Sequence, residues 1–83
     1  MPSILIIWND EIEEYLLQHG VSVDEFEEVV LNARKVERSR TSGRPIVFGQ
    51  TSTGRFLACV FEYLDDHKFE IIPVTAFESD GSH

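Results

Sequence analysis

The stretch "PIVFGQTSTGRFLACVFEYL", Pro45 to Leu64, decides the fold. Two runs rich in β-branched and aromatic residues, 45–50 and 56–64, flank the Gly-containing segment "TSTGR" at 51–55. Strand-like runs on either side of a short loop with glycine predict a β-hairpin. The second run is apolar almost throughout, which is typical of a central strand that is buried on both faces. The hairpin therefore predicts the middle of a sheet.

Shorter strand signals lie on both sides of this hairpin. The segment "KVERSR" at 35–40 alternates weakly between apolar and polar residues, and "TSGR" at 41–44 predicts a turn. After the turn "DDH", the segment "KFEIIPVTAFE" at 68–78 predicts a last strand. Pro73 has no N–H to donate to a neighbouring strand, so this strand is expected at a sheet edge or with a bulge there. The apolar run "SILIIW" at 3–8 predicts a buried first strand.

Two amphipathic helices are predicted between the first strand and the hairpin. The first helix carries side chains at i, i+3, i+4 and i+7 on one face: Ile12, Tyr15, Leu16 and His19. Asn9 or Asp10 can cap its start, and Gly20 can take the left-handed conformation at its end. These signals predict a helix that ends just before Gly20.

The second helix has a more complete start signal. Ser22 and Glu25 have the S-x-x-E spacing of a capping box, and Val21 and Phe26 are spaced as a hydrophobic staple. This pattern predicts a helix at 23–32. Its buried stripe is expected to consist of Val23, Phe26, Val29, Val30 and Ala33.

The predicted element order is β-α-α-β-β-β-β, an α+β fold with two N-terminal helices packed on one face of a mainly antiparallel sheet. One domain is expected over 1–78, followed by a flexible tail at 79–83. Alternation along 56–64 assigns the bulky set to the helix side: Leu57, Cys59, Phe61 and Tyr63. The smaller set, Ala58, Val60 and Glu62, is then expected on the open face. Glu62 is the polar candidate there.

Charge is distributed unevenly along the chain. The 83 residues hold 7 Lys and Arg against 15 Asp and Glu, a net charge of −8. Six of the basic residues nevertheless fall within 34–55, where Glu37 is the only acid: Arg34, Lys35, Arg38, Arg40, Arg44 and Arg55. Such segregation predicts a localised binding face. Arg38, Arg40 and Arg44 are expected near one turn, with Arg55 roughly 20 Å away at the opposite rim, at ~3.3 Å per strand residue.

Several classes of protein are disfavoured by composition. The single Cys59 cannot form an internal disulfide, which suggests a reducing compartment. The first residues lack a basic segment, and the apolar run is too short for a signal peptide or a membrane span. A cytoplasmic protein without membrane contact is expected. Cys59 and the scattered histidines, at 19, 67 and 83, lack metal-ligand spacing, so neither a metal nor another cofactor is expected.

Three segments stand out in order and spacing: "WND" before the first helix, "HGVS" between the helices, and "RPIVFGQTSTGRFLACV" at 44–60. Together they resemble the BrnT-type toxins of bacterial type II toxin–antitoxin systems. The resemblance runs from Trp8 to about Thr75 and implies a RelE-like ribonuclease fold, an RNA substrate and an antitoxin partner. The end "IIPVTAFE" is similar to a related group of small bacterial domains. Two basic positions of the BrnT type are not matched: the first helix has Glu11, Ile12 or Glu13 in place of a Lys, and 73–78 contains no basic residue.

Metal-independent RNA cleavage requires groups that move protons and cations that hold the phosphate. With the resemblance, this chemistry nominates His19, Glu62 and Arg55 as catalytic residues. The substrate-binding candidates are Arg38, Arg40, Arg44 and Tyr63, and Tyr63 is also a candidate for taking or giving a proton. At the rim of a hairpin, Arg55 is expected to add little to the core, so Arg55→Ala should leave the fold intact.

Each candidate also has a purely structural interpretation. His19 can serve as a cap facing the helix dipole, and the arginines can pair with acids or decorate a solvated sheet. The acidic helix faces fit solvated surface, and Trp8 fits a core anchor better than a base-stacking residue. Two hypotheses follow. The chain is a toxin-type endoribonuclease restrained by an antitoxin, or a non-catalytic relative that binds protein or RNA on the same sheet.

Overall fold

The computed structural model describes residues 4–66 and 69–79. The elements are β1 (Leu5–Ile6), α1 (Asp10–Gln18), α2 (Val23–Asn32), β2 (Glu37–Arg38), β3 (Pro45–Gln50), β4 (Phe56–Tyr63) and β5 (Glu70–Glu78). The predicted α+β class and the order β-α-α-β-β-β-β are confirmed. The expected tail at 79–83 lies outside the described residues except for Ser79, as do His67 and His83.

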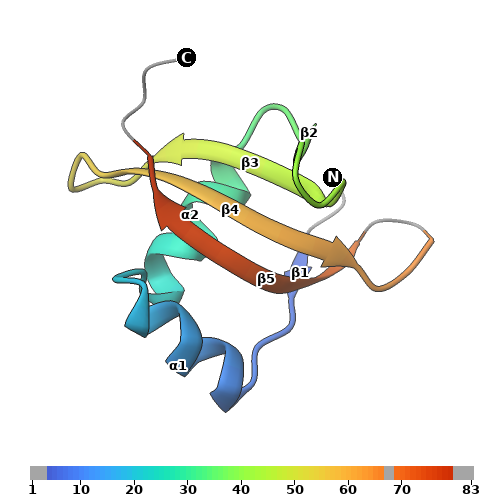
Figure 1. The fold of residues 1–83 in the computed structure, drawn as a ribbon, viewed down its shortest axis with the longest axis horizontal. Helices are drawn as coiled ribbons and strands as arrows, with labels where there is room; N and C mark the ends of the chain where they lie inside the picture. The colour runs from blue at the N-terminus through green and yellow to red at the C-terminus, as the bar shows by residue number, and fades with distance from the viewer. Residues whose placement is uncertain (1–3, 67–68, 80–83) are drawn as a thin grey trace.

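The five strands of the described chain form one sheet in the order β1-β5-β4-β3-β2. The β1 strand runs parallel to β5, and the other neighbours are antiparallel. Figure 1 shows both helices on the same side of this sheet, with β3, β4 and β5 crossing above them. The β4 strand lies in the centre, as its apolar sequence predicts.

The alternation along β4 separates two apolar clusters. Leu57, Cys59 and Phe61 join the main core, which includes Leu16 of α1 and Phe26 and Val29 of α2. Ala58 and Val60 form a smaller cluster with Ile46 of β3. The predicted assignment of the two faces of β4 is therefore confirmed.

The start of α2 has the capping box that the sequence predicts. The Oγ of Ser22 accepts from the N–H of Glu25 at 3.2 Å, and Oε1 of Glu25 accepts from the N–H of Ser22 at 3.1 Å. Val21 and Phe26 are fully buried, consistent with the staple. Trp8 packs edge-on against Phe26, with ring centroids 5.4 Å apart, so it is a core anchor as expected.

Pro73 predicts either an edge strand or a bulge, and the structure has the bulge. The β5 strand lies between β1 and β4, so it is not an edge. Val60 lies opposite Thr75 and Phe61 lies opposite Pro73, which leaves Val74 as the extra residue of β5. A bulge reverses the alternation of side chains beyond it. Ile71 therefore points into the main core, whereas Phe77, six residues further, pairs with Ala58 on the opposite face.

Two predicted strands are shorter than their sequences suggest. The expectation of a buried strand at 3–8 is wrong in extent, because β1 comprises Leu5–Ile6 and Leu5 is 54% exposed. The side chain of Leu5 is exposed and that of Ile6 is buried, so β1 buries only one of its faces. The β2 strand comprises Glu37–Arg38, and the turn closes where the N–H of Ser39 donates to the carbonyl of Arg44 at 2.8 Å.

The predicted apolar face of α1 is also less buried than its spacing indicates. Leu16 is buried and Ile12 is half-buried, whereas Tyr15 and His19 are exposed. The helix lies under β5, near the end of the sheet (Figure 1). The sheet therefore covers only Leu16 and part of Ile12 on the apolar face of α1.

Candidate functional site

The β2–β3 turn brings two of the predicted substrate-binding arginines together. The Nη1 of Arg38 donates to the carbonyl of Gly43 at 3.1 Å, and the Nε of Arg44 lies 3.6 Å from Oε1 of Glu62. That Nε is enclosed and has no hydrogen-bond partner among the described residues. Arg38, Arg44, Glu62 and Tyr63 line one groove of about 500 Å³, which we call the turn groove. Four of the seven predicted site residues therefore meet here.

A second groove lies on the open face of the sheet, and we call it the face groove. It has a volume of about 600 Å³. Its apolar floor comes from Ile46 and Phe48 of β3 and Phe77 of β5, and its polar rim includes Arg38 and Arg40. Because Arg38 lines both grooves, they adjoin one another.

The floor of the face groove follows from strand register. Phe48 pairs with Ala58, and Ala58 pairs with Phe77, so the three residues form a row across β3, β4 and β5. Ala58 is fully buried, whereas Phe77 is 44% exposed. A large aromatic side chain thus remains open to solvent beside two arginines.

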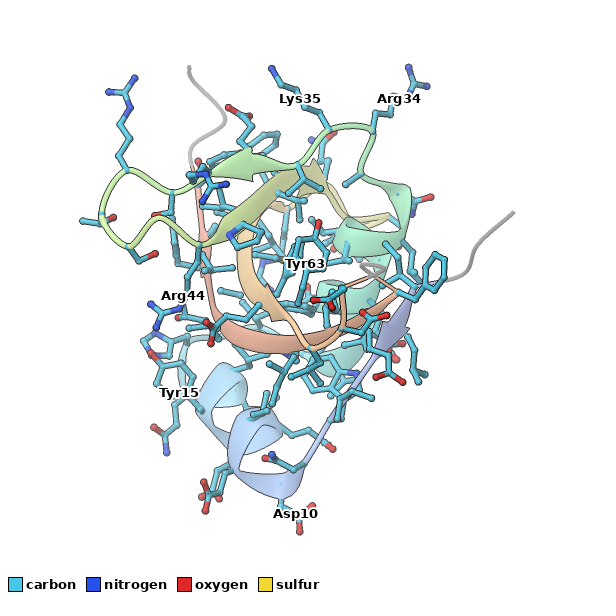
Figure 2. All side chains as sticks on the ribbon, turned by 90° about the vertical axis from the view of Figure 1, so that its right-hand side faces the viewer. Asp10, Tyr15, Arg34, Lys35, Arg44 and Tyr63 are labelled. Carbon is cyan, nitrogen blue, oxygen red and sulfur yellow. The ribbon has the colours of Figure 1, made fainter. Side chains whose placement is uncertain are left out.

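Positive charge gathers at this end of the molecule. Arg34 and Lys35 line a further groove of about 380 Å³ with Gly49 and Gln50 of β3. Figure 2 shows Arg34 and Lys35 extending from the body at the end opposite Asp10 of α1. The basic residues beside β2 are then Arg34, Lys35, Arg38, Arg40 and Arg44. The sequence prediction of a localised basic region agrees with this arrangement.

Arg55 lies elsewhere and is held by acids. Its Nη1 donates to both carboxylate oxygens of Glu25, at 2.8 and 2.9 Å, and to the carbonyl of Gly20 at 2.8 Å. Its Nε donates to Oε2 of Glu78 at 3.2 Å. The carboxylates of Glu78 and Glu25 raise the pKa of Arg55 above its ordinary value. The alternative that the arginines pair with acids therefore applies to Arg55, and the ion pair between Arg44 and Glu62 fits it as well.

His19 lies on the same side of the molecule as Arg55. It is the C-cap of α1, and its ring stacks at a tilt on Tyr15 with centroids 4.6 Å apart. The hydroxyl of Tyr15 lies 3.3 Å from Oγ1 of Thr75 in β5. The next residue after His19 is Gly20, whose carbonyl accepts from Arg55. Because His19 is the C-cap of α1, its interpretation as a cap agrees with the structure.

The three predicted catalytic residues are not brought together. Arg55 precedes β4 and Glu62 lies near its end, so their backbones are about 20 Å apart at ~3.3 Å per residue. His19 and Arg55 occupy one end of the strand, whereas Glu62 lies with Arg44 at the other. A site that uses all three at once is therefore inconsistent with the fold.

Sequence reasoning missed Phe77 as a site residue. In an unbroken strand, Phe77 shares the face of Ile71 and points toward the helices. The bulge at Val74 turns Phe77 to the open face instead. Pro73 was the available signal, because it predicts a bulge, but it does not say which residue becomes the extra one.

None of the described helices is long and apolar enough to cross a membrane. Within residues 4–66 and 69–79, no group of three or more His, Cys, Asp or Glu side chains is arranged to hold a metal ion. No protein family, curated protein or solved structure with which the chain was compared matches it.

Proposed function

We propose that this chain binds RNA at the turn groove and the face groove, as a module that does not cleave its ligand. The observation that carries the proposal is the gathering of Arg38, Arg40 and Arg44 around two adjoining grooves, of which the face groove lies on the open face of the sheet. Arginine suits phosphate because its planar fork donates to two oxygens at once.

The local charge supports an anionic ligand even though the chain is acidic overall. The turn groove contains two arginines and Glu62, and the face groove contains two arginines and Glu37. Each groove is therefore net positive, within a chain whose net charge is −8. Long-range repulsion from the remaining acids is screened over about 10 Å at 0.1 M salt, whereas contacts inside the grooves are shorter than that.

Binding fits the arrangement better than cleavage does. Acid–base catalysis needs its groups within hydrogen-bond reach of one reacting centre. Glu62 lies at the opposite end of β4 from Arg55, and Arg55 is already occupied by Glu25 and Glu78. The catalytic set nominated from the sequence therefore cannot act on one phosphate.

A toxin-type endoribonuclease restrained by an antitoxin is the second candidate function. The element order supports it, because it is the order that the BrnT-type resemblance implies. A cleaving version of this site would have to use Glu62, Tyr63 and Arg44, which line the turn groove together. Such an enzyme would not depend on His19.

The test measures anisotropy of a short labelled RNA with the intact protein. Arg38→Gln, Arg40→Gln and Arg44→Gln should each weaken binding, by about tenfold for a lost charged hydrogen-bond donor. Arg34→Gln is the matched control, because Arg34 lines neither of these two grooves and its loss should change affinity little. Three phosphate contacts predict a slope of about −2 in log affinity against log salt.

The same samples distinguish the two candidate functions. RNA that stays intact on a gel without metal supports a binding module. Cleavage that Glu62→Gln abolishes and His19→Ala retains supports the ribonuclease in the turn groove. Wild-type protein that shows no salt-dependent RNA binding contradicts both.

A further inference from the structure

We infer that the face groove takes one unpaired nucleotide, with its base stacked on Phe77 and its phosphate held by Arg38 or Arg40. This inference rests on the proposed RNA binding and specifies the form of RNA that the site accepts. It does not concern the catalytic candidates, none of which lines this groove.

The first step is the exposure of Phe77 on the open face of the sheet. Large aromatic side chains on a sheet are normally buried, because each removes 150–250 Å² from water when covered. Phe77 lies near the end of β5, and its side chain nevertheless remains 44% exposed. The bulge at Val74 is what directs it to the open face, next to the small Ala58. The fold therefore presents this ring on the side of the sheet that the helices do not cover.

The second step is the composition of the groove around the ring. Ile46 and Phe48 complete an apolar floor. The rim has two arginines, one acid and two hydroxyl groups: Arg38, Arg40, Glu37, Ser39 and Thr41. An apolar surface with a few polar groups at its edge is the usual composition of a small-ligand site. The volume of about 600 Å³ lies within the range of about 300–1,000 Å³ for such sites.

The third step is the match to a nucleotide in a single strand. A nucleotide has a flat apolar face and an anionic group a short distance away, which are the two features that Phe77 and the arginines complement. Sheet faces with exposed aromatic residues recognise single strands in this way, because unpaired bases can be splayed out and stacked. Bases in a duplex are stacked on each other and cannot reach the ring. An acidic peptide would pair with Arg38 and Arg40 but would leave the ring unused.

The experiment compares three labelled probes of equal length with the full chain: a single-stranded RNA, the same backbone without bases, and an RNA duplex. Phe77→Leu keeps an apolar side chain but removes the aromatic face. Phe69→Leu is the matched control, because Phe69 is also in the β5 region and is 45% exposed. Stacking one base predicts that Phe77→Leu weakens single-strand binding about tenfold and leaves the abasic probe unchanged.

The outcomes separate this inference from the proposed function. Weakening by Phe77→Leu that is confined to the probe with bases supports the inference. Equal weakening of both probes, or no effect of Phe77→Leu while Arg38→Gln weakens binding, overturns the inference and leaves RNA binding in place. Absence of RNA binding by wild-type protein, with or without binding of an acidic peptide, overturns both.

A second variant keeps the inference falsifiable if Phe77→Leu does not fold. Phe77→Trp retains an aromatic face and should bind the single strand at least as tightly as wild type. The fluorescence of the new tryptophan should be quenched when the RNA with bases binds. Wild-type protein, which contains only Trp8, gives the background signal to subtract. Quenching by the abasic probe to the same extent contradicts stacking.

Discussion

Arg55 donates two hydrogen bonds to the carboxylate of Glu25, from the hairpin loop to the first turn of α2. Glu25 is at the same time the reciprocal partner of Ser22 in the capping box. Because the Nε of Arg55 also donates to Glu78, one guanidinium joins the hairpin, the start of α2 and the end of β5. A residue that the sequence places on a rim is thus a junction between three elements.

Arg55→Gln is therefore expected to lower the thermal unfolding midpoint by several degrees. The change leaves the carboxylates of Glu25 and Glu78 near one another without their shared cation, so the loss exceeds that of an ordinary surface pair. The measurement is thermal unfolding followed by circular dichroism, with Arg40→Gln, a change at an exposed arginine, as control. The expectation from sequence that Arg55→Ala leaves the fold intact is a separate one, and it is contradicted only if that variant is unfolded.

The pH dependence of stability should report the same junction. The N–H of Ser22 and the side chain of Arg55 lower the pKa of Glu25 below its ordinary 4.5, while burial acts in the opposite direction. A depressed carboxyl pKa adds stability that is complete above the unfolded value and is lost as the pH falls through the folded value. The difference in free energy of unfolding between wild type and Glu25→Gln should therefore be largest above pH 4.5 and shrink below it.

Denaturant unfolding at a series of pH values measures this difference. Glu14→Gln provides the control, because Glu14 lies on the exposed side of α1. A gap between wild type and Glu25→Gln that stays constant from neutral pH to well below 4.5 contradicts the assignment.

The start of α2 agrees with prediction, whereas the surroundings of Arg55 could not be predicted. The bounds of α2 follow from Ser22 and Glu25, which are neighbours in sequence and satisfy each other. The environment of Arg55 depends instead on Glu25 and Glu78, which are 30 and 23 residues away. Local patterns cannot encode such pairs, because the pairs form only when the sheet and the helices are assembled.

The candidate site shows the same division. The grouping of Arg38 with Arg44 follows from one short turn and is predictable. The placement of Phe77 in one groove with Arg38 and Arg40 requires the order of the strands and the position of one extra residue in β5. A shift by one residue moves every later side chain to the other face. The part of the site that carries the proposed base stacking therefore lies beyond what periodicity can predict.

Gly49→Ala is expected to destabilise the protein by about 1–3 kcal/mol, because it overpacks a tight contact. A methyl group at Gly49 would lie 3.2 Å from Cγ1 of Val29, which is buried between α2 and β3. Truncating the neighbour should relieve the contact, so Gly49→Ala combined with Val29→Ala should cost less than the sum of the two single changes. Urea unfolding of the four proteins measures this coupling, and additive costs would contradict the close approach.

Cys59 should react with thiol reagents only when the protein opens. It is fully buried in the main core, and burial raises the pKa of its thiol to about 12. Since the thiolate is the reactive form, both access and ionisation oppose labelling of the folded chain at neutral pH. We expect native protein to react with a chromogenic disulfide reagent orders of magnitude more slowly than urea-unfolded protein.

Destabilising changes such as Gly49→Ala should accelerate the labelling of Cys59 in proportion to the population of open molecules. Rapid labelling of stable wild-type protein would show that Cys59 is accessible in the native state, contrary to the fold described here.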